Sequence, residues 1–237
     1  MTRVLLTGFE PFDGARVNPS WEVAELLADE GIGLPGVEVA AVRLPVVFSR
    51  VRGLLAAALE RDAPDVVIGL GLAAGRPHVS VERVGINLAV ARIPDNEGDR
   101  PRDVPLAPGR PDAHLATLPV GELLAGDPRL LDSLSAGAYV CNAVLFHLLD
   151  LVALVAPGTE RVRAAGFLHV PATGPDALAS HDEVGTGGGA GGSVGTEGAG
   201  ADVPQVPLRD VADVVAGAVR LTLEARAGSA ASGQPDG

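Results

Sequence analysis

The chain has 237 residues, of which 47% are apolar, and its formal net charge is −12 at pH 7. This apolar content is enough to bury a full core, whereas the acidic balance argues against a nucleic-acid partner, whose phosphates need clustered Lys and Arg. All 18 basic residues are Arg, which excludes lysine mechanisms such as Schiff-base chemistry and a P-loop.

The single cysteine, Cys141, cannot form an intramolecular disulfide, and this fits a reducing compartment. The chain does not open with a cationic leader and an apolar stretch. Its apolar runs are far shorter than the roughly 20 residues that cross a bilayer. We therefore expect a cytoplasmic protein without a membrane partner.

The first 71 residues alternate between short Val- and Leu-rich runs and runs with helical spacing of apolar residues. These runs predict strands at 3–9, 37–47 and 64–71, and helices at 19–30 and 49–62. Asn18 is the expected N-cap of the first helix, which has Pro19 at its first position, and Ser49 is the expected cap of the second.

The rest of the chain is less regular. Residues 79–90 alternate and predict a strand or a hairpin, whereas the Pro, Asp and Gly content of 92–111 predicts a loop. The regular elements expected later are a helix from near Cys141 to about Val155, a strand at 163–171 and a closing helix at 208–226.

Alternating strands and helices predict an α/β fold, a single-domain three-layer α/β/α sandwich with a mostly parallel twisted sheet. We expect this domain to occupy residues 1–226. The Gly-rich stretch 185–202 is low in complexity and cannot pack a core, so it is expected to be a flexible insertion. Residues 227–237 are expected to form a disordered tail.

The stretch GLGLAAG (69–75) invites a dinucleotide-binding interpretation. Its glycine spacing departs from the usual fingerprint, and no helix is predicted after it to receive a pyrophosphate. We interpret it as a Gly-rich turn at a strand end. The five histidines lack His-Glu-x-x-His spacing and a lone cysteine cannot build a structural zinc site, so we predict no metal and no other cofactor.

Cys141 precedes a predicted apolar helix, and the pattern leaves two interpretations open. A lone cysteine is often a small buried hydrophobe, but a helix start favours thiolate and leaves backbone N–H groups free for an oxyanion. His169 ends a predicted strand, where working sites of open α/β sheets lie, together with Phe9 and Leu72. It is the best candidate base, although a hydrogen-bonded core histidine would look the same.

Several blocks of the sequence resemble one family. These blocks are TGFEPF (7–12), NPSW (18–21), VSVERVGIN (79–87), ARIPDNEG (91–98), SAGAYVCN (135–142) and GFLHVP (166–171). They resemble pyroglutamyl peptidase I, also called pyrrolidone-carboxylate peptidase, in the family's order and approximate spacing over residues 1–171.

The resemblance implies a catalytic triad. Cys141 is the nucleophile, His169 is the base, and Glu82 orients the imidazole. It also implies that Arg92 lies beside the thiol and helps to hold the oxyanion. The pattern alone predicts that Glu82 is a solvated strand charge or a partner for Arg83. It predicts equally that Arg92 pairs with Asp95 or Glu97 of its own loop.

The resemblance further implies an aromatic substrate pocket formed by Phe9 and Phe12, with Asn18 reaching the lactam. From pattern alone, the two Phe side chains could equally be packing residues. Two positions depart from the family's common pattern: Leu72 stands where many relatives have a polar residue, and Asp13 replaces a Gly. Leu72 is compatible with a pocket that uses its backbone carbonyl.

The function implied is removal of an N-terminal pyroglutamyl residue from small peptides through a thioester. Two alternatives remain open: a thiol amidase of the same fold with an altered pocket, and a non-catalytic peptide-binding relative. The resemblance also implies a homo-oligomer, either a dimer or a tetramer.

Overall fold

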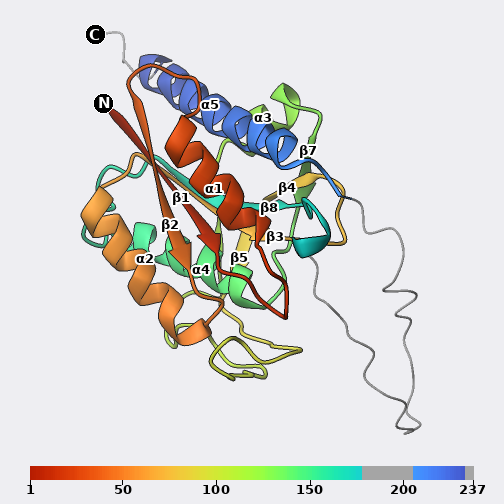
Figure 1. Ribbon diagram of the computed structural model, residues 1–237. Coiled ribbons are helices and arrows are strands. Elements are labelled where there is room, and N and C mark those ends of the chain that lie inside the picture. Colours follow the sequence, from red (N-terminus) through yellow and green to blue (C-terminus); the bar gives the residue numbers. More distant parts are fainter. Residues whose placement is uncertain (178–204, 233–237) are drawn as a thin grey trace, which may run out of the picture.

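A six-stranded sheet forms the centre of the computed structural model, which describes residues 1–177 and 205–232 (Figure 1). The sheet has the order β2-β1-β3-β8-β4-β7. Its strands are β1 (Thr2–Phe9), β2 (Val37–Leu44), β3 (Val66–Leu72), β4 (Val79–Glu82), β7 (Leu130–Ser133) and β8 (Ala164–Val170). The helices are α1 (Pro19–Glu30), α2 (Phe48–Asp62), α3 (Val120–Gly126), α4 (Val140–Ala153) and α5 (Leu208–Ser232).

The sheet is parallel from β2 to β8 and reverses once. Strands β1, β2, β3 and β8 run in the same direction, β4 is antiparallel to β8, and β7 is parallel to β4. The carboxyl ends of β1, β3 and β8 therefore meet at one edge of the sheet. The mostly parallel sheet predicted from the sequence is confirmed.

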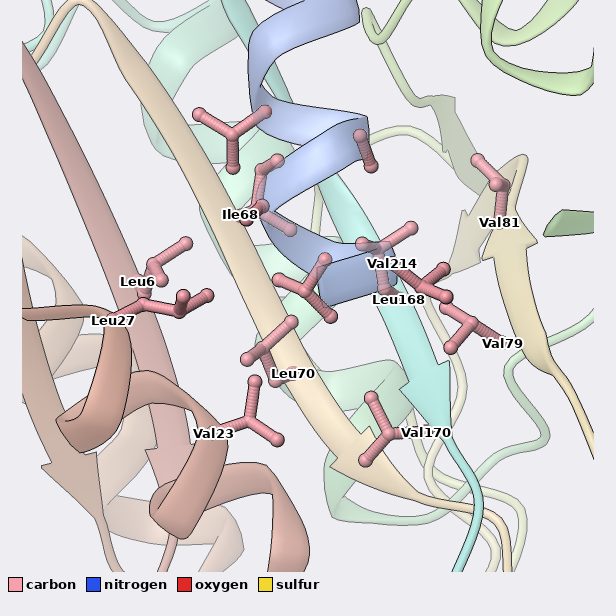
Figure 2. Packing of buried hydrophobic residues seen from close by; sticks show 14 of the residues in the cluster. Leu6, Val23, Leu27, Ile68, Leu70, Val79, Val81, Leu168, Val170 and Val214 are labelled. Carbon is pink, nitrogen blue, oxygen red and sulfur yellow. The ribbon is translucent and has the colours of Figure 1, made fainter. Parts of the chain in front are cut away.

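Alternating side chains divide the buried residues into two hydrophobic clusters, one on each face of the sheet. On one face, Leu6, Ile68 and Leu168 pack against α1, α3 and α5 (Figure 2). On the other face, Leu5, Val67 and Phe167 pack against α2 and α4. Figure 1 shows the resulting three layers, with α1 and α5 on one side of the sheet and α2 and α4 on the other.

The start of α1 agrees with the sequence prediction. The Asn18 side chain accepts a hydrogen bond from the backbone N–H of Ser20 at 3.2 Å, Pro19 opens the helix, and Gly31 follows it at a φ of 76°. The predicted cap of α2 is wrong, because Ser49 lies inside the helix and Val47 is the N-cap residue. The free N–H of Phe48 instead donates to Asp95 Oδ2 at 3.0 Å, a partner too distant in sequence to be predicted.

Residues 79–90 do not form a hairpin. The strand breaks at Arg83, so that β4 stays in the main sheet while β5 (Val84–Ile86) pairs with β6 (Ala113–Leu115) in a separate two-stranded sheet. Three short elements, β6, β7 and α3, were not predicted, because three to seven residues carry too little periodicity.

The closing helix is longer than predicted. Helix α5 runs to Ser232, so the first residues of the expected tail at 227–237 are helical. The last residues of the expected tail, 233–237, and the Gly-rich stretch 185–202 lie outside the described residues. Within the described part of the chain, none of the helices combines the length and apolarity that a membrane span requires.

A buried carboxylate joins α4 to two other parts of the fold. Asp150 is fully buried and accepts hydrogen bonds from Arg52 of α2 at 2.8 Å and from Arg110, in the loop predicted at 92–111, at 2.7 Å. His114 Nε2 of β6 lies 3.2 Å from the same carboxylate. These contacts lower the pKa of Asp150 against the opposing effect of burial. Asp150 therefore ties α2, α4 and the loop together.

Replacing this carboxylate should destabilise the protein. Asp150→Ala leaves two arginines without the buried partner that orders them, and removing one member of such a buried network costs about 3 kcal/mol. Denaturant unfolding followed by circular dichroism measures the change. Asp132→Ala is the matched control, because its partner Arg83 and its own side chain are both well exposed, and its unfolding should match the wild type. Equal stability of the two variants would contradict a structural role for Asp150.

Candidate active site

Cys141 lies in the first turn of α4, whose N-terminus points toward the carboxyl edge of the sheet. The N-cap residue, Tyr139, has extended backbone and makes no side-chain cap. The N–H groups of the first helical turn have no intrahelical partner, and the helix dipole gives this end a partial positive charge. The thiol therefore lies where negative charge is stabilised.

Two glycines of β3 make room for this thiol and for the ring beneath it. A Cβ at Gly71 would lie 2.9 Å from Cys141 Sγ and 2.7 Å from Phe167 Cζ, and a Cβ at Gly69 would lie 2.5 Å from Phe167 Cδ2. Both glycines belong to the strand predicted at 64–71, and the turn that ends this strand begins only after Leu72. The two glycines are two residues apart because alternate residues of a strand lie on the same face of the sheet, and this face is covered by α4.

His169 and Glu82 meet on the same face of the sheet. Antiparallel pairing sets Ser80 opposite His169 and Glu82 opposite Phe167, which makes Glu82 and His169 diagonal neighbours. Nδ1 of His169 lies 2.7 Å from Oε1 of Glu82 and donates to it. His169 is only 6% exposed and Glu82 is fully buried. The imidazole is therefore held by one carboxylate in one orientation.

The electrostatics of this pair favour charge on both groups. Burial opposes charge on the imidazole, but hydrogen bonds with Cys141 and Glu82 outweigh it and raise the pKa of His169 to about 9. Burial likewise opposes charge on the carboxyl, but its contacts, those with His169 first, hold the pKa of Glu82 below its ordinary value. The imidazole of His169 is therefore charged near neutral pH.

The segment that carries Arg92 is fastened to the start of α4. Asn142 accepts from the N–H of Ile86 and donates to the carbonyls of Ile86 and Leu88, all within 3.0 Å. The Val90 N–H donates to the Ala138 carbonyl at 2.9 Å. The residue after the thiol therefore positions the chain that leads to Arg92.

Arg92 itself is exposed, and its guanidinium pairs with no other side chain among residues 1–177 and 205–232. The acidic residues that pattern alone offered as partners are occupied. Asp95 accepts from backbone N–H groups, and Glu97 pairs with Arg50 at 3.3 Å. The guanidinium of Arg92 is therefore free among the described residues.

Aromatic side chains cluster beside the thiol. Tyr139 lies 5.5 Å from Phe12 and 5.3 Å from Phe48 between ring centroids, and its hydroxyl donates to the carbonyl of Pro94 at 3.0 Å. Burial, followed by nearby negative charge that includes Cys141, raises the pKa of Tyr139 well above its usual range. Sequence reasoning missed Tyr139 and Phe48, although Tyr139 lies two residues before the thiol.

The other pocket residues expected from the resemblance lie close to this cluster in the fold. Phe9 is 3% exposed within the hydrophobic cluster of the α2 and α4 face, whereas Phe12 is half-buried. The Asn18 side chain accepts from Ser20 through Oδ1 and donates one N–H of Nδ2 to the Glu10 carbonyl at 3.0 Å. Leu72 ends β3 opposite Val170, next to His169.

The other histidines of the described chain do not join the site. His147 Nδ1 lies 3.3 Å from Arg52 Nη1, in the network around Asp150, and burial followed by the charge of Arg52 lowers the pKa of His147 to about 4. Across residues 1–177 and 205–232, no three His, Cys, Asp or Glu side chains are grouped as metal ligands would be.

A thiol at a helix start, a buried imidazole and a buried carboxylate, assembled on a three-layer α/β/α domain, define a cysteine-dependent hydrolase. Comparison with known proteins specifies the family. The family model of pyroglutamyl peptidase matches residues 2–189, and the chain belongs to this family.

Named relatives and solved structures agree with this assignment. The chain is 49% identical to the pyrrolidone-carboxylate peptidase of Gloeobacter violaceus over 173 residues, which is 71% of this chain and 81% of that one. It is 47% identical to the Streptomyces coelicolor pyrrolidone-carboxylate peptidase over 176 residues, 72% of this chain and 78% of that one. A mutant pyrrolidone carboxyl peptidase from Pyrococcus furiosus superposes with a TM-score of 0.78 at 34% identity, covering 94% of this chain and 99% of that one. Pyroglutamyl peptidase I from Bacillus amyloliquefaciens gives a TM-score of 0.78 at 28% identity, with 94% and 98% covered.

Adding a methyl group at Gly71 should impair the site. Gly71→Ala forces its new Cβ against Cys141 Sγ and the Phe167 ring, and a displacement of about 1 Å at reacting atoms can cost about 100-fold in rate. Gly75→Ala is the control, because nothing lies within 4 Å of a Cβ there. The rate of thiol alkylation by iodoacetamide measures the effect without any substrate. Equal alkylation rates in the two variants would show that Gly71 does not set the position of the thiol.

The raised pKa of His169 predicts a pH-dependent stability. The folded state binds the imidazolium more tightly than the unfolded state does, so this contribution is complete below about pH 6.5 and is lost as pH rises through about 9. The difference in unfolding free energy between wild type and His169→Gln should therefore shrink from pH 6.5 to 9.5. His147→Gln is the control, because an imidazole with a pKa of about 4 stays neutral throughout this range. A constant difference for His169→Gln would mean that His169 is not charged in the fold.

Proposed function

We propose that this chain removes the N-terminal pyroglutamyl residue from peptides by cysteine acyl transfer. One observation carries the proposal: His169 lies between the thiol of Cys141 and the buried carboxylate of Glu82, at the carboxyl edge of the sheet. This is the arrangement that a nucleophile, a base and an orienting acid require. Membership of the pyroglutamyl peptidase family identifies the substrate class.

The chemistry proceeds in two halves. The Cys141 thiolate attacks the scissile carbonyl, which joins the pyroglutamyl residue to the rest of the peptide, and a tetrahedral intermediate forms. The C–N bond then breaks as His169 gives its proton to the departing amine, which leaves a thioester. His169, now neutral, takes a proton from water as the water attacks the thioester, and the Cys141 thiolate departs with release of pyroglutamic acid. Glu82 holds the imidazole in one tautomer in both halves.

The developing oxyanion is stabilised from two directions. The N–H groups at the start of α4 supply hydrogen bonds and the positive end of the helix dipole. The guanidinium of Arg92, without a partner in the described chain and fastened near the helix start through Asn142, supplies positive charge. Neither contribution requires a metal ion.

The lactam ring binds against the aromatic cluster. Phe12 and Tyr139 offer ring faces beside the thiol, while the deeply buried Phe9 supports them from the core. Asn18 holds the segment after β1 through its bonds to Ser20 and to the Glu10 carbonyl, and the second N–H of its Nδ2, which has no partner among the described residues, reaches the lactam. Leu72 contributes its backbone carbonyl to the pocket. This carbonyl is the same whether the position holds Leu or the polar residue of many relatives.

A thiol amidase with an altered pocket is the alternative that Leu72 and Asp13 keep open. Turnover of pyroglutamyl, alanyl and acetylated chromogenic amides separates the two, since a pocket that hydrogen-bonds the lactam strongly rejects analogues without it. A dimer or tetramer, which the family resemblance implies, is measured by light scattering of the same preparation.

The thiol itself provides the decisive test. Cys141→Ala should abolish turnover of a pyroglutamyl amide, by at least about 10⁴-fold, because nucleophile and base act as a unit. Circular dichroism and melting temperature should match the wild type, since Ala fills most of the same small site. Alkylation of the wild type at Cys141 should inactivate it stoichiometrically. Retained turnover in folded Cys141→Ala would overturn the mechanism, and absence of pyroglutamyl turnover in the wild type would overturn the substrate class.

A further inference from the structure

A second cation contacts the carboxylate that orients His169. Arg76, in the turn between β3 and β4, places its Nη1 2.9 Å from Oε1 of Glu82, the same oxygen that accepts from His169. The same Nη1 lies 3.4 Å from the hydroxyl of Ser133 on β7. The backbone N–H of Arg76 donates to the carbonyl of Ala73 at 2.9 Å, which fixes the turn.

The two ends of this ion pair differ in burial. Glu82 is fully buried, whereas the side chain of Arg76 is 35% exposed and reaches inward from the surface. The other carboxylate oxygen of Glu82, Oε2, has no hydrogen-bond partner among the described residues. A buried carboxylate with an unpartnered oxygen is costly to keep ionised unless a charge compensates it.

His169 cannot be that compensating charge throughout the reaction, because it gives up and regains a proton in every cycle. Arg76 keeps its charge at all relevant pH values. The groups that face Glu82 are His169 from β8, Arg76 from the β3–β4 turn and the hydroxyl of Ser133 from β7, while Cys141 of α4 lies on the far side of His169. Arg76 is thus the only permanent positive charge against Glu82 among the described residues.

We propose that Arg76 is a positioning residue for the reaction: it keeps Glu82 ionised and aimed at His169 while the imidazole changes its charge. Arg76 touches neither the thiol nor the substrate, and it acts through Glu82 alone. The inference rests on the proposed function, in which His169 cycles between its charged and neutral forms.

The loss of Arg76 should change the pH dependence of kcat/KM. Without the guanidinium, Glu82 takes up a proton more readily and no longer supports the imidazolium, so the thiolate–imidazolium pair forms only at higher pH. In Arg76→Gln, the acidic limb of kcat/KM should move to higher pH by about one unit, which is about a tenfold loss at pH 6. The loss should be much smaller near pH 8, and KM should change little.

Two further variants complete the experiment. Arg76→Lys keeps a positive charge at this position and should recover most of the activity at pH 6. Arg83→Gln is the matched control, because Arg83 directly follows Glu82 in the chain but pairs with exposed Asp132 at 2.6 Å, and its pH profile should match that of the wild type.

The pH dependence of Cys141 alkylation by iodoacetamide gives the same readout without a peptide substrate. It distinguishes failure of this inference from failure of the proposed function. If the acidic limb of the alkylation rate moves to higher pH in Arg76→Gln, the positioning role is supported even if pyroglutamyl amides are not cleaved. An unchanged or downward-shifted limb, an effect on KM alone, or an equal shift in Arg83→Gln would overturn it.

Discussion

The contact between Glu82 and His169 places an ionised carboxylate inside the protein, and much of the site is arranged around this constraint. A buried carboxylate is tolerated only when charge and hydrogen bonds replace its water. Here the replacement comes from the imidazole at 2.7 Å and from the guanidinium of Arg76 at 2.9 Å. The pair exists because the sheet reverses direction between β8 and β4, which sets Glu82 opposite Phe167 and diagonal to His169 on the face covered by α4.

The nucleophile reaches this pair through close packing. Helix α4 approaches the sheet closely enough that Gly69 and Gly71 must lack side chains, and Phe167 fills the space between them. The ring of Phe167 lies 5.0 Å from the ring of His169, so the core residue beneath the thiol also packs against the base. Asn142 then fastens the neighbouring segment to the same helix. Hydrophobic packing by Phe167 and hydrogen bonding by Asn142 therefore both fix the position of the start of α4, which carries the thiol.

Arginine compensates the buried acids in several parts of this lysine-free chain. Asp65 meets Arg161 at 3.0 Å, Asp150 meets Arg52 and Arg110, and Glu82 meets Arg76. A planar guanidinium on a long apolar stem can reach a buried carboxylate while part of it stays in water. The networks around Asp150 and Glu82 lie in different parts of the fold. The first ties helices and loop together, and the second holds the imidazole of His169.

The sequence by itself determined the layers and the main elements, and it offered Cys141 and His169 as candidates for the reacting residues. Periodicity revealed β1, α1, β3 and α4, and placed Cys141 at a helix start and His169 at a strand end, because these are local properties of short segments. Glu82 was recognised only through family resemblance. Its partner His169 lies 87 residues further along the chain, and the pattern around Glu82 is typical of an exposed charge.

Tertiary structure alone decided the remaining contacts. It showed that Asp95 caps α2 in place of Ser49, and that β5 leaves the strand predicted at 79–90. It also brought Glu82 to His169, and Tyr139 to Phe12. Each of these depends on which strands pair and which helix covers them, and such long-range geometry leaves no periodic signal along the chain.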